Sequence, residues 1–86
     1  MQKYVKIYLD YFDYGEQHFI PCECCGSKSN DIHHIYGRGK GKDVIKNLMA
    51  LCRECHTKAH ESKLSKSDLQ YIHNSFLAGK RNPFLK

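Results

Sequence analysis

The 86-residue sequence has no long hydrophobic run. No segment approaches the roughly 20 consecutive apolar residues that a membrane-spanning helix needs, which excludes a transmembrane protein and a membrane partner. Charged side chains interrupt residues 1–20, so this segment lacks the apolar stretch of a secretory signal peptide. We therefore expect a cytoplasmic protein.

The sequence also lacks internal repeats and low-complexity segments, and its length suits a single domain over residues 1–86. A core of this size often needs a disulfide, a metal or a partner to be stable. The five cysteines are an odd number, which argues against a closed set of disulfides. In an intracellular protein cysteines are more often metal ligands, so a bound metal is the expected stabiliser.

Four of the cysteines form two C-x-x-C pairs, Cys22 with Cys25 and Cys52 with Cys55, whereas Cys24 belongs to neither. Each pair can deliver two thiolates to one tetrahedral ion. The spacing predicts a structural Zn²⁺ site at these four residues. A thiol redox protein is the alternative, although no βαβ pattern surrounds either pair.

The net charge of +5 is carried by the second half of the chain. Residues 46–86 contain eight Lys or Arg residues against three acidic ones. This excess is compatible with binding to a polyanion, and a merely soluble surface is the alternative. The candidates for contacts with nucleic-acid phosphates are Arg38, Lys40, Lys58, Lys63, Lys66, Lys80 and Arg81.

The hydrophobic spacing predicts short helices and short strands, hence a small α+β fold. Residues 4–12 also fit the alternation of a strand, but helix is preferred, with an end near Gly15. A capping-box pattern at Ser67 and Gln70 predicts the start of the last helix. In chain order the expected elements are a helix over 4–12, a strand over 31–35, a glycine-rich basic loop over 37–42, a strand over 48–51, a helix over 53–63 and a helix over about 67–78.

Four histidines carry the candidate chemistry. His33 and His34 are neighbours on a predicted strand, so their side chains point to opposite faces. His56 and His60 are four residues apart on a predicted helix and share a face. One strand histidine can therefore join the helix pair on a metal ion while the other acts nearby as a base; the alternative is that all four are ordinary surface and strand residues. The remaining histidines are isolated, and we expect only surface or core positions for His18 and His73.

These motifs together resemble the HNH endonuclease family in its zinc-knuckle, ββα-metal subtype, and the size of the chain is similar to that of phage enzymes. The resemblance covers residues 22–60. It is carried by the two cysteine pairs, by the stretch from Asp31 to Ile35 with its paired histidines, by the glycine-rich loop, and by the stretch from Asn47 to His56. The family fold consists of two short antiparallel strands and a helix that together hold a divalent ion.

The resemblance also implies a role for each matching residue. His34 takes the position of the general base, and His33 and His56 take those of metal ligands. Asn47 matches the residue that fastens the loop and orients the base, and His60 matches an additional ligand. As a second choice for a ligand, or for the partner of one, we consider Asp31.

The expected activity is hydrolysis of phosphodiester bonds in double-stranded DNA. A histidine with a pKa near 6.5 can accept the proton of the attacking water at pH 7. A divalent cation such as Mg²⁺, Mn²⁺, Ni²⁺ or Zn²⁺ would stabilise the developing charge, with Arg38 as a further support. The alternative is a non-catalytic zinc-knuckle module that binds nucleic acid. No recognition module is visible beyond the core, so a protein partner could supply specificity.

Overall fold

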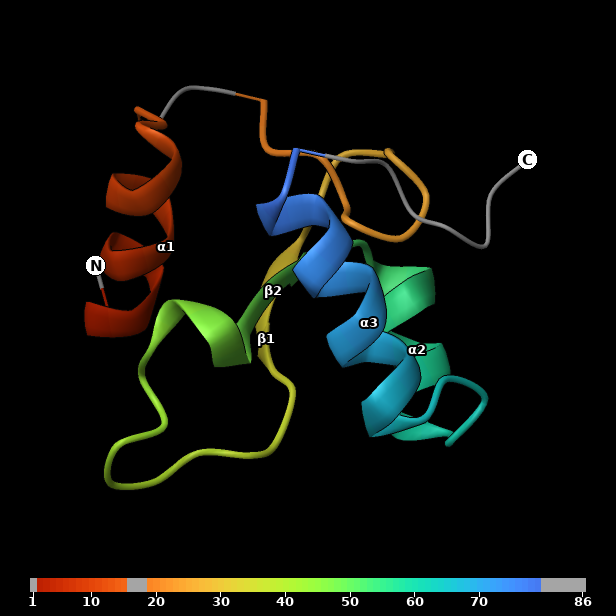
Figure 1. Ribbon diagram of the computed structural model, residues 1–86. Coiled ribbons are helices and arrows are strands. Elements are labelled where there is room, and N and C mark those ends of the chain that lie inside the picture. The colour runs from red at the N-terminus through yellow and green to blue at the C-terminus, as the bar shows by residue number, and fades with distance from the viewer. Residues whose placement is uncertain (1, 16–18, 80–86) are drawn as a thin grey trace.

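Two short antiparallel strands lie between one helix on one side and two helices on the other (Figure 1). The computed structural model describes residues 2–15 and 19–79, so His18, Lys80 and Arg81 lie outside the described residues. The fold class agrees with the predicted small α+β domain. The elements in chain order are α1 (Lys3–Phe12), β1 (Asp31–His34), the 3₁₀ turn η1 (Ile45–Asn47), β2 (Leu48–Leu51), α2 (Arg53–His60) and α3 (Lys66–Leu77).

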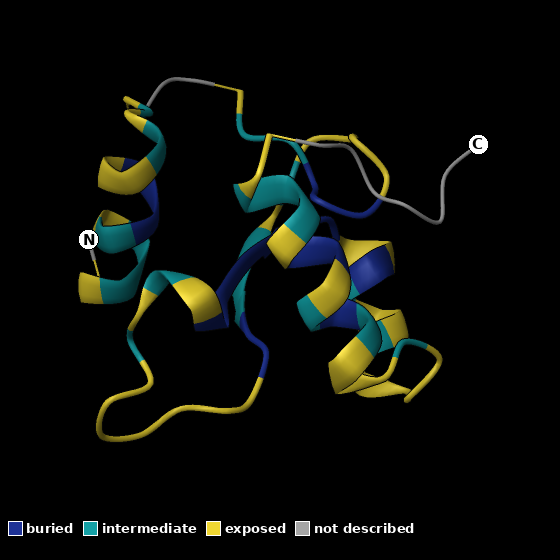
Figure 2. Cartoon of the chain, viewed as in Figure 1, coloured by how far each residue is buried: buried dark blue, intermediate teal, exposed yellow. Residues whose placement is uncertain are grey.

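Strand β2 is the centre of the core, because all four of its residues are buried (Figure 2). Successive strand residues point to opposite faces. Met49 and Leu51 accordingly pack with residues of α3, whereas Leu48 and Ala50 pack against Tyr8 of α1. The sheet therefore has a helix-covered surface on both faces.

The pairing of the strands decides the face on which each histidine lies. His33 pairs with Met49, and His34 pairs with Leu48. Because paired residues of antiparallel strands project to the same face, His33 lies on the α2 and α3 face and His34 on the α1 face. The two neighbouring histidines are thus separated by the strand that carries them.

Residues 4–12 are helical, as preferred from the sequence, and the strand alternative is wrong. The helix buries Tyr8 and Leu9, which lie on the face that packs against the sheet. It ends at Phe12, earlier than the expected end near Gly15, because Asp13 adopts the left-handed conformation with φ of 56°. None of the described helices is long and apolar enough to cross a membrane.

The start of α3 differs from the prediction in one respect. The N-cap is Ser65, whose hydroxyl accepts a hydrogen bond from the backbone nitrogen of Asp68 at 3.0 Å, and not Ser67. The Asp68 carboxylate in turn accepts from the backbone nitrogen of Ser65, which completes a capping box. Gln70 is predicted from the sequence to form the capping box with Ser67, but its side-chain nitrogen instead donates to the carbonyl oxygen of Lys46. Two overlapping patterns compete here, and the shorter Asp68 side chain reaches back to its cap.

A buried polar network joins the segments on both sides of the sheet. The Glu23 carboxylate accepts hydrogen bonds from the Tyr8 hydroxyl at 2.6 Å and from the Ala50 backbone nitrogen at 3.1 Å. Its other oxygen lies 2.6 Å from Nδ1 of His73, whose Nε2 donates to the carbonyl oxygen of Ile45 at 2.6 Å. Burial, and then the charge of Glu23, raise the pKa of Tyr8, so its hydroxyl remains a donor. His73 is therefore a core residue that connects α3 to the rest of the fold.

Candidate metal centres and active site

The four cysteines of the two C-x-x-C pairs lie close enough to share one metal ion. Their sulfur atoms are all within 4.8 Å of one another, and the sulfurs of Cys25 and Cys52 are 3.6 Å apart. Two ligands of a tetrahedral zinc ion with bonds of about 2.3 Å are separated by about 3.8 Å, so the cluster fits this ion. All five cysteines are free of disulfides. The arrangement is a zinc-type site between the segment of Cys22 and Cys25 and the start of α2.

Cys24 is buried beside this cluster without belonging to it. A hydrogen bond from Cys24 is the largest of the effects that lower the pKa of Cys22 to about 4. The same bond, together with burial, raises the pKa of Cys24. Cys24 therefore acts as a protonated donor to the thiolate of Cys22, a role that the C-x-x-C spacing alone does not indicate.

Three histidines form a second cluster on the outer side of β1. The rings of His33 and His56 have centroids 4.9 Å apart, and the Nε2 atoms of His56 and His60 are 3.1 Å apart. Nitrogen ligands on one ion with bonds of about 2.0–2.1 Å are separated by about 3.0 to 3.4 Å, so this spacing also fits a shared cation. Burial, and then the neighbouring His56, His60 and His34, lower the pKa of His33 to about 4. Its imidazole is thus neutral at pH 7, the form that binds metals.

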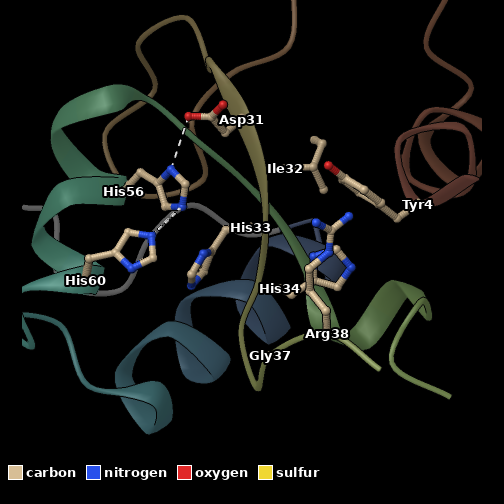
Figure 3. Close-up of a pocket in the computed structure, with 9 residues that line it drawn as sticks. All are labelled: Tyr4, Asp31, Ile32, His33, His34, Gly37, Arg38, His56 and His60. Carbon is tan, nitrogen blue, oxygen red and sulfur yellow. Dashed lines mark hydrogen bonds and ion pairs between the residues drawn. The ribbon is translucent and has the colours of Figure 1, made fainter. Parts of the chain in front are cut away.

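Asp31 lies next to this cluster and orients one of its members. A carboxylate oxygen of Asp31 is 3.1 Å from Nδ1 of His56 (Figure 3). With the Nδ1 proton held by Asp31, Nε2 of His56 presents its lone pair toward His60. The contact corresponds to the partner role considered for Asp31 from the sequence, and a ligand role for His56 remains a prediction.

His34 lies apart from the other three histidines and has its own carboxylate partner. Its Nε2 atom is 2.8 Å from Oδ1 of Asp43, and only 8% of the residue is exposed. Because the carboxylate fixes the proton on Nε2, Nδ1 is left as the acceptor. Sequence reasoning missed Asp43, which follows the glycine-rich loop nine residues after His34 and belongs to no recognised spacing.

Asn47 fastens the loop that follows β1. Its side-chain oxygen accepts from the backbone nitrogen of Tyr36 at 2.8 Å, and its side-chain nitrogen donates to the carbonyl oxygens of Gly37 and Lys42 at 3.2 and 2.9 Å. These three bonds tie both ends of the loop to η1. Asp43 follows Lys42 directly, so the amide also fixes the backbone that presents the partner of His34.

The histidines on both sides of β1 border one open cavity of about 400 Å³. β1 is an edge strand, so side chains from its two faces meet around its free edge. Figure 3 shows His33, His56 and His60 on one side of the strand and His34, Arg38 and Tyr4 on the other. The cavity thus joins a candidate cation site, a histidine with a free ring nitrogen and a guanidinium.

The basic residues predicted for phosphate contacts are exposed where the structure describes them. Arg38 and Lys40 lie on the loop between β1 and η1, which is exposed along most of its length (Figure 2). Lys58 is on α2, and Lys63 lies just beyond it, 3.5 Å from a carboxylate oxygen of Glu61. These positions leave the cations accessible to a ligand.

Comparison with known proteins agrees with the resemblance drawn from the motifs. A family model described as HNH endonuclease matches residues 22–62. The chain is 35% identical to an uncharacterized protein, YdfU, of Escherichia coli K12 over 56% of this chain and 15% of that protein. It is 33% identical to a mitochondrial DNA mismatch repair protein, a mutS homolog of Sarcophyton glaucum, over 60% of this chain and 6% of that protein. The chain thus spans less than a sixth of the length of either relative. No solved structure matches significantly.

Proposed function

We propose that this chain, whose residues 22–62 match an HNH endonuclease family model, hydrolyses phosphodiester bonds of double-stranded DNA with a histidine base and one divalent cation. The observation that supports the proposal is that four histidines line one cavity and lie on two sides of strand β1. Three of them, His33, His56 and His60, lie close enough together to share one cation, and the fourth, His34, is hydrogen-bonded to a carboxylate instead.

His34 is the proposed general base. Asp43 holds the proton on Nε2 and orients the ring, so that Nδ1 can accept the proton of an attacking water. The charge of the Asp43 carboxylate would also stabilise the imidazolium that forms when this proton is taken up. Asn47 supports the arrangement by holding both ends of the loop that carries Asp43.

His33, His56 and His60 are the proposed ligands of the catalytic cation. When bound, a divalent cation such as Mg²⁺, Mn²⁺, Ni²⁺ or Zn²⁺ supplies charge stabilisation to the phosphate and to the departing 3′ oxygen. Asp31 keeps His56 in the tautomer that presents Nε2. The three ligands come from two elements, β1 and α2, so their spacing depends on how these elements are held together.

The cysteine cluster is the proposed site of a structural Zn²⁺ that holds these elements together. Cys22 and Cys25 precede β1, and Cys52 and Cys55 bracket the start of α2. Zinc binding at such sites contributes directly to folding free energy. A protein partner that supplies sequence specificity is also part of the proposal, because the described residues form only the nuclease core and two flanking helices.

The deciding experiment is cleavage of supercoiled plasmid by the purified chain with each of the four cations, beside the variant His34→Ala. Cleavage by the wild type that the variant loses supports the nuclease. DNA binding by both proteins without cleavage under any cation would overturn it in favour of a non-catalytic zinc-knuckle module. The control is Asn74→Ala. Asn74 is exposed on α3 and does not line the cavity, so this variant should cleave like the wild type.

A further inference from the structure

Helix α1 lies outside the segment that matches the HNH family, yet it supplies one wall of the cavity. The contact is made by Tyr4 in the first turn of the helix. The Tyr4 ring lies edge-on to the ring of His34, with centroids 4.6 Å apart, and the guanidinium carbon of Arg38 lies 4.9 Å from the centre of the Tyr4 ring (Figure 3). One side chain of α1 therefore contacts two candidate active-site residues.

Arg38 has little else to fix its position. It lies between two glycines with positive φ, Gly37 at 85° and Gly39 at 144°, on the exposed loop. Among residues 2–15 and 19–79, its guanidinium makes one hydrogen bond and one ring contact, both with the N-terminal segment. The ring is that of Tyr4, and the side-chain oxygen of Gln2 accepts from a guanidinium nitrogen at 3.1 Å. A guanidinium stacks on an aromatic face while its N–H groups stay free at the edges.

We propose that Tyr4 is a positioning residue, which holds the guanidinium of Arg38 at the cavity so that its N–H groups meet the phosphate of the DNA strand. The inference rests on the proposed function and assigns a role to a helix that the family match does not cover. A guanidinium kept in place before the substrate arrives loses less conformational freedom on binding a phosphate. Arg38 is the group that touches DNA, and Tyr4 acts through it.

A double-mutant cycle tests this coupling. Tyr4→Leu should lower kcat/KM for plasmid cleavage by about 3- to 30-fold, the range of a cation–π contact. Tyr4→Phe keeps the ring and should stay within about twofold of the wild type. In the background of Arg38→Ala, Tyr4→Leu should cause no further loss. The matched control is Tyr11→Leu, since Tyr11 is a 53% exposed tyrosine of the same helix that does not line the cavity.

Three results would overturn the proposal. Equal losses from Tyr4→Leu with and without Arg38 would mean that Tyr4 acts through His34 or through the fold. A shifted pH profile of kcat in Tyr4→Leu would mean that Tyr4 acts through His34, because His34 is the proposed general base. An unchanged rate in Tyr4→Leu would show that the ring contributes nothing to the reaction.

A measurement without cleavage separates this inference from the proposed function. In the NMR spectrum of the zinc-loaded chain, the side-chain protons of Arg38 should show a ring-current shift that Tyr4→Leu abolishes and Tyr4→Phe preserves. DNA affinity, measured in Ca²⁺, should fall in Tyr4→Leu only when Arg38 is present. If the wild type cleaves no DNA but both effects appear, the nuclease proposal fails and the positioning role stands. If neither effect appears, the positioning role fails whatever the activity.

Discussion

The imidazole of His73 lies 2.6 Å from a carboxylate oxygen of Glu23, 50 residues away in the chain. Neither side chain is accessible to solvent. Through Nε2, the same imidazole holds the carbonyl oxygen of Ile45, the first residue of the turn that ends at Asn47. Helix α3 is thereby hydrogen-bonded to the segment between Cys22 and Cys25 and to η1, whose last residue, Asn47, fastens the loop after β1.

Removal of this imidazole should destabilise the fold strongly. In His73→Ala the Glu23 carboxylate and the Ile45 carbonyl lose a buried partner, and the expected loss is about 3–5 kcal/mol of unfolding free energy. The measurement is urea unfolding of the zinc-loaded chain. Asn74→Ala, an exposed neighbour on α3, should change the midpoint little. If His73→Ala lowers the unfolding free energy by less than about 1 kcal/mol, the hydrogen bonds of His73 do not stabilise the fold as predicted.

Zinc should be required for folding. Cys52→Ser removes one of four ligands, and binding free energies of such sites are about 10 kcal/mol or more, so the variant should lose both the metal and its cooperative thermal transition. Metal analysis of the wild type should give one zinc per chain at the cysteines. Cys24→Ser is the control, because Cys24 lies outside the ligand group and the serine hydroxyl can keep the hydrogen bond to Cys22. Retention of the transition in Cys52→Ser would contradict the prediction.

The base and the ligands should respond differently to substitution. His34→Ala should reduce cleavage by about 10²- to 10⁴-fold, the usual contribution of a general base, with metal affinity nearly unchanged. His33→Ala and His56→Ala should weaken calorimetric metal binding instead, and higher metal concentration should restore part of their activity. If His34→Ala loses the metal while His33→Ala keeps it, the assignment of the two neighbours is reversed.

The carboxylate partner of the base should matter for rate more than for stability. Asp43→Asn removes the charge beside Nε2 of His34, and we expect kcat to fall by about 10- to 100-fold. Losses of this size, about 10- to 100-fold, are typical when a residue hydrogen-bonded to a metal-ligating histidine is replaced. The unfolding midpoint should change little, since the Asp43 side chain is 38% exposed. Asp10→Asn, an exposed carboxylate paired with Lys6 on α1, serves as the control. A kcat equal to that of the wild type would show that His34 does not depend on Asp43.

DNA affinity should fall steeply as salt increases and depend little on sequence, because phosphate contacts release counterions. Lys40→Ala should reduce the slope of log affinity against log salt by about one. Lys63→Ala should have a smaller effect, since Lys63 already lies beside Glu61. Binding isotherms on two unrelated duplexes over a range of salt concentrations measure both quantities. A flat salt dependence would exclude the phosphate contacts.

The parts of the molecule that the sequence predicted are those with a fixed local spacing. The two cysteine pairs and the i, i+4 pair His56 and His60 follow directly from knuckle and helix geometry. The opposite faces of His33 and His34 follow from the strand period. In each case the partners are brought together by the chain itself or by one short element.

The contacts that the sequence could not predict join residues whose spacing along the chain matches no known motif or element. Asp43 reaches His34 across a loop, and Tyr4 reaches Arg38 from a helix outside the motif. Helix ends were similarly ambiguous, because Ser65 and Ser67 both precede a polar residue at the right distance for a cap. The choice also depends on a tertiary contact, because Gln70 donates to the carbonyl oxygen of Lys46.

Helix α2 shows how little hydrophobic burial supports the histidine cluster. All eight of its residues are described, and the single buried one is Cys55, with Ala59 half-buried beside it. So narrow an apolar face does little to fix the position of the helix, so coordination of the proposed zinc ion by Cys55 would take over that task. Because His56 is the next residue, the two proposed ions would be linked through one peptide unit. An ion of larger radius among the sulfurs would then move the proposed nitrogen ligand of the second ion, so the chemistry of one metal would depend on the identity of the other.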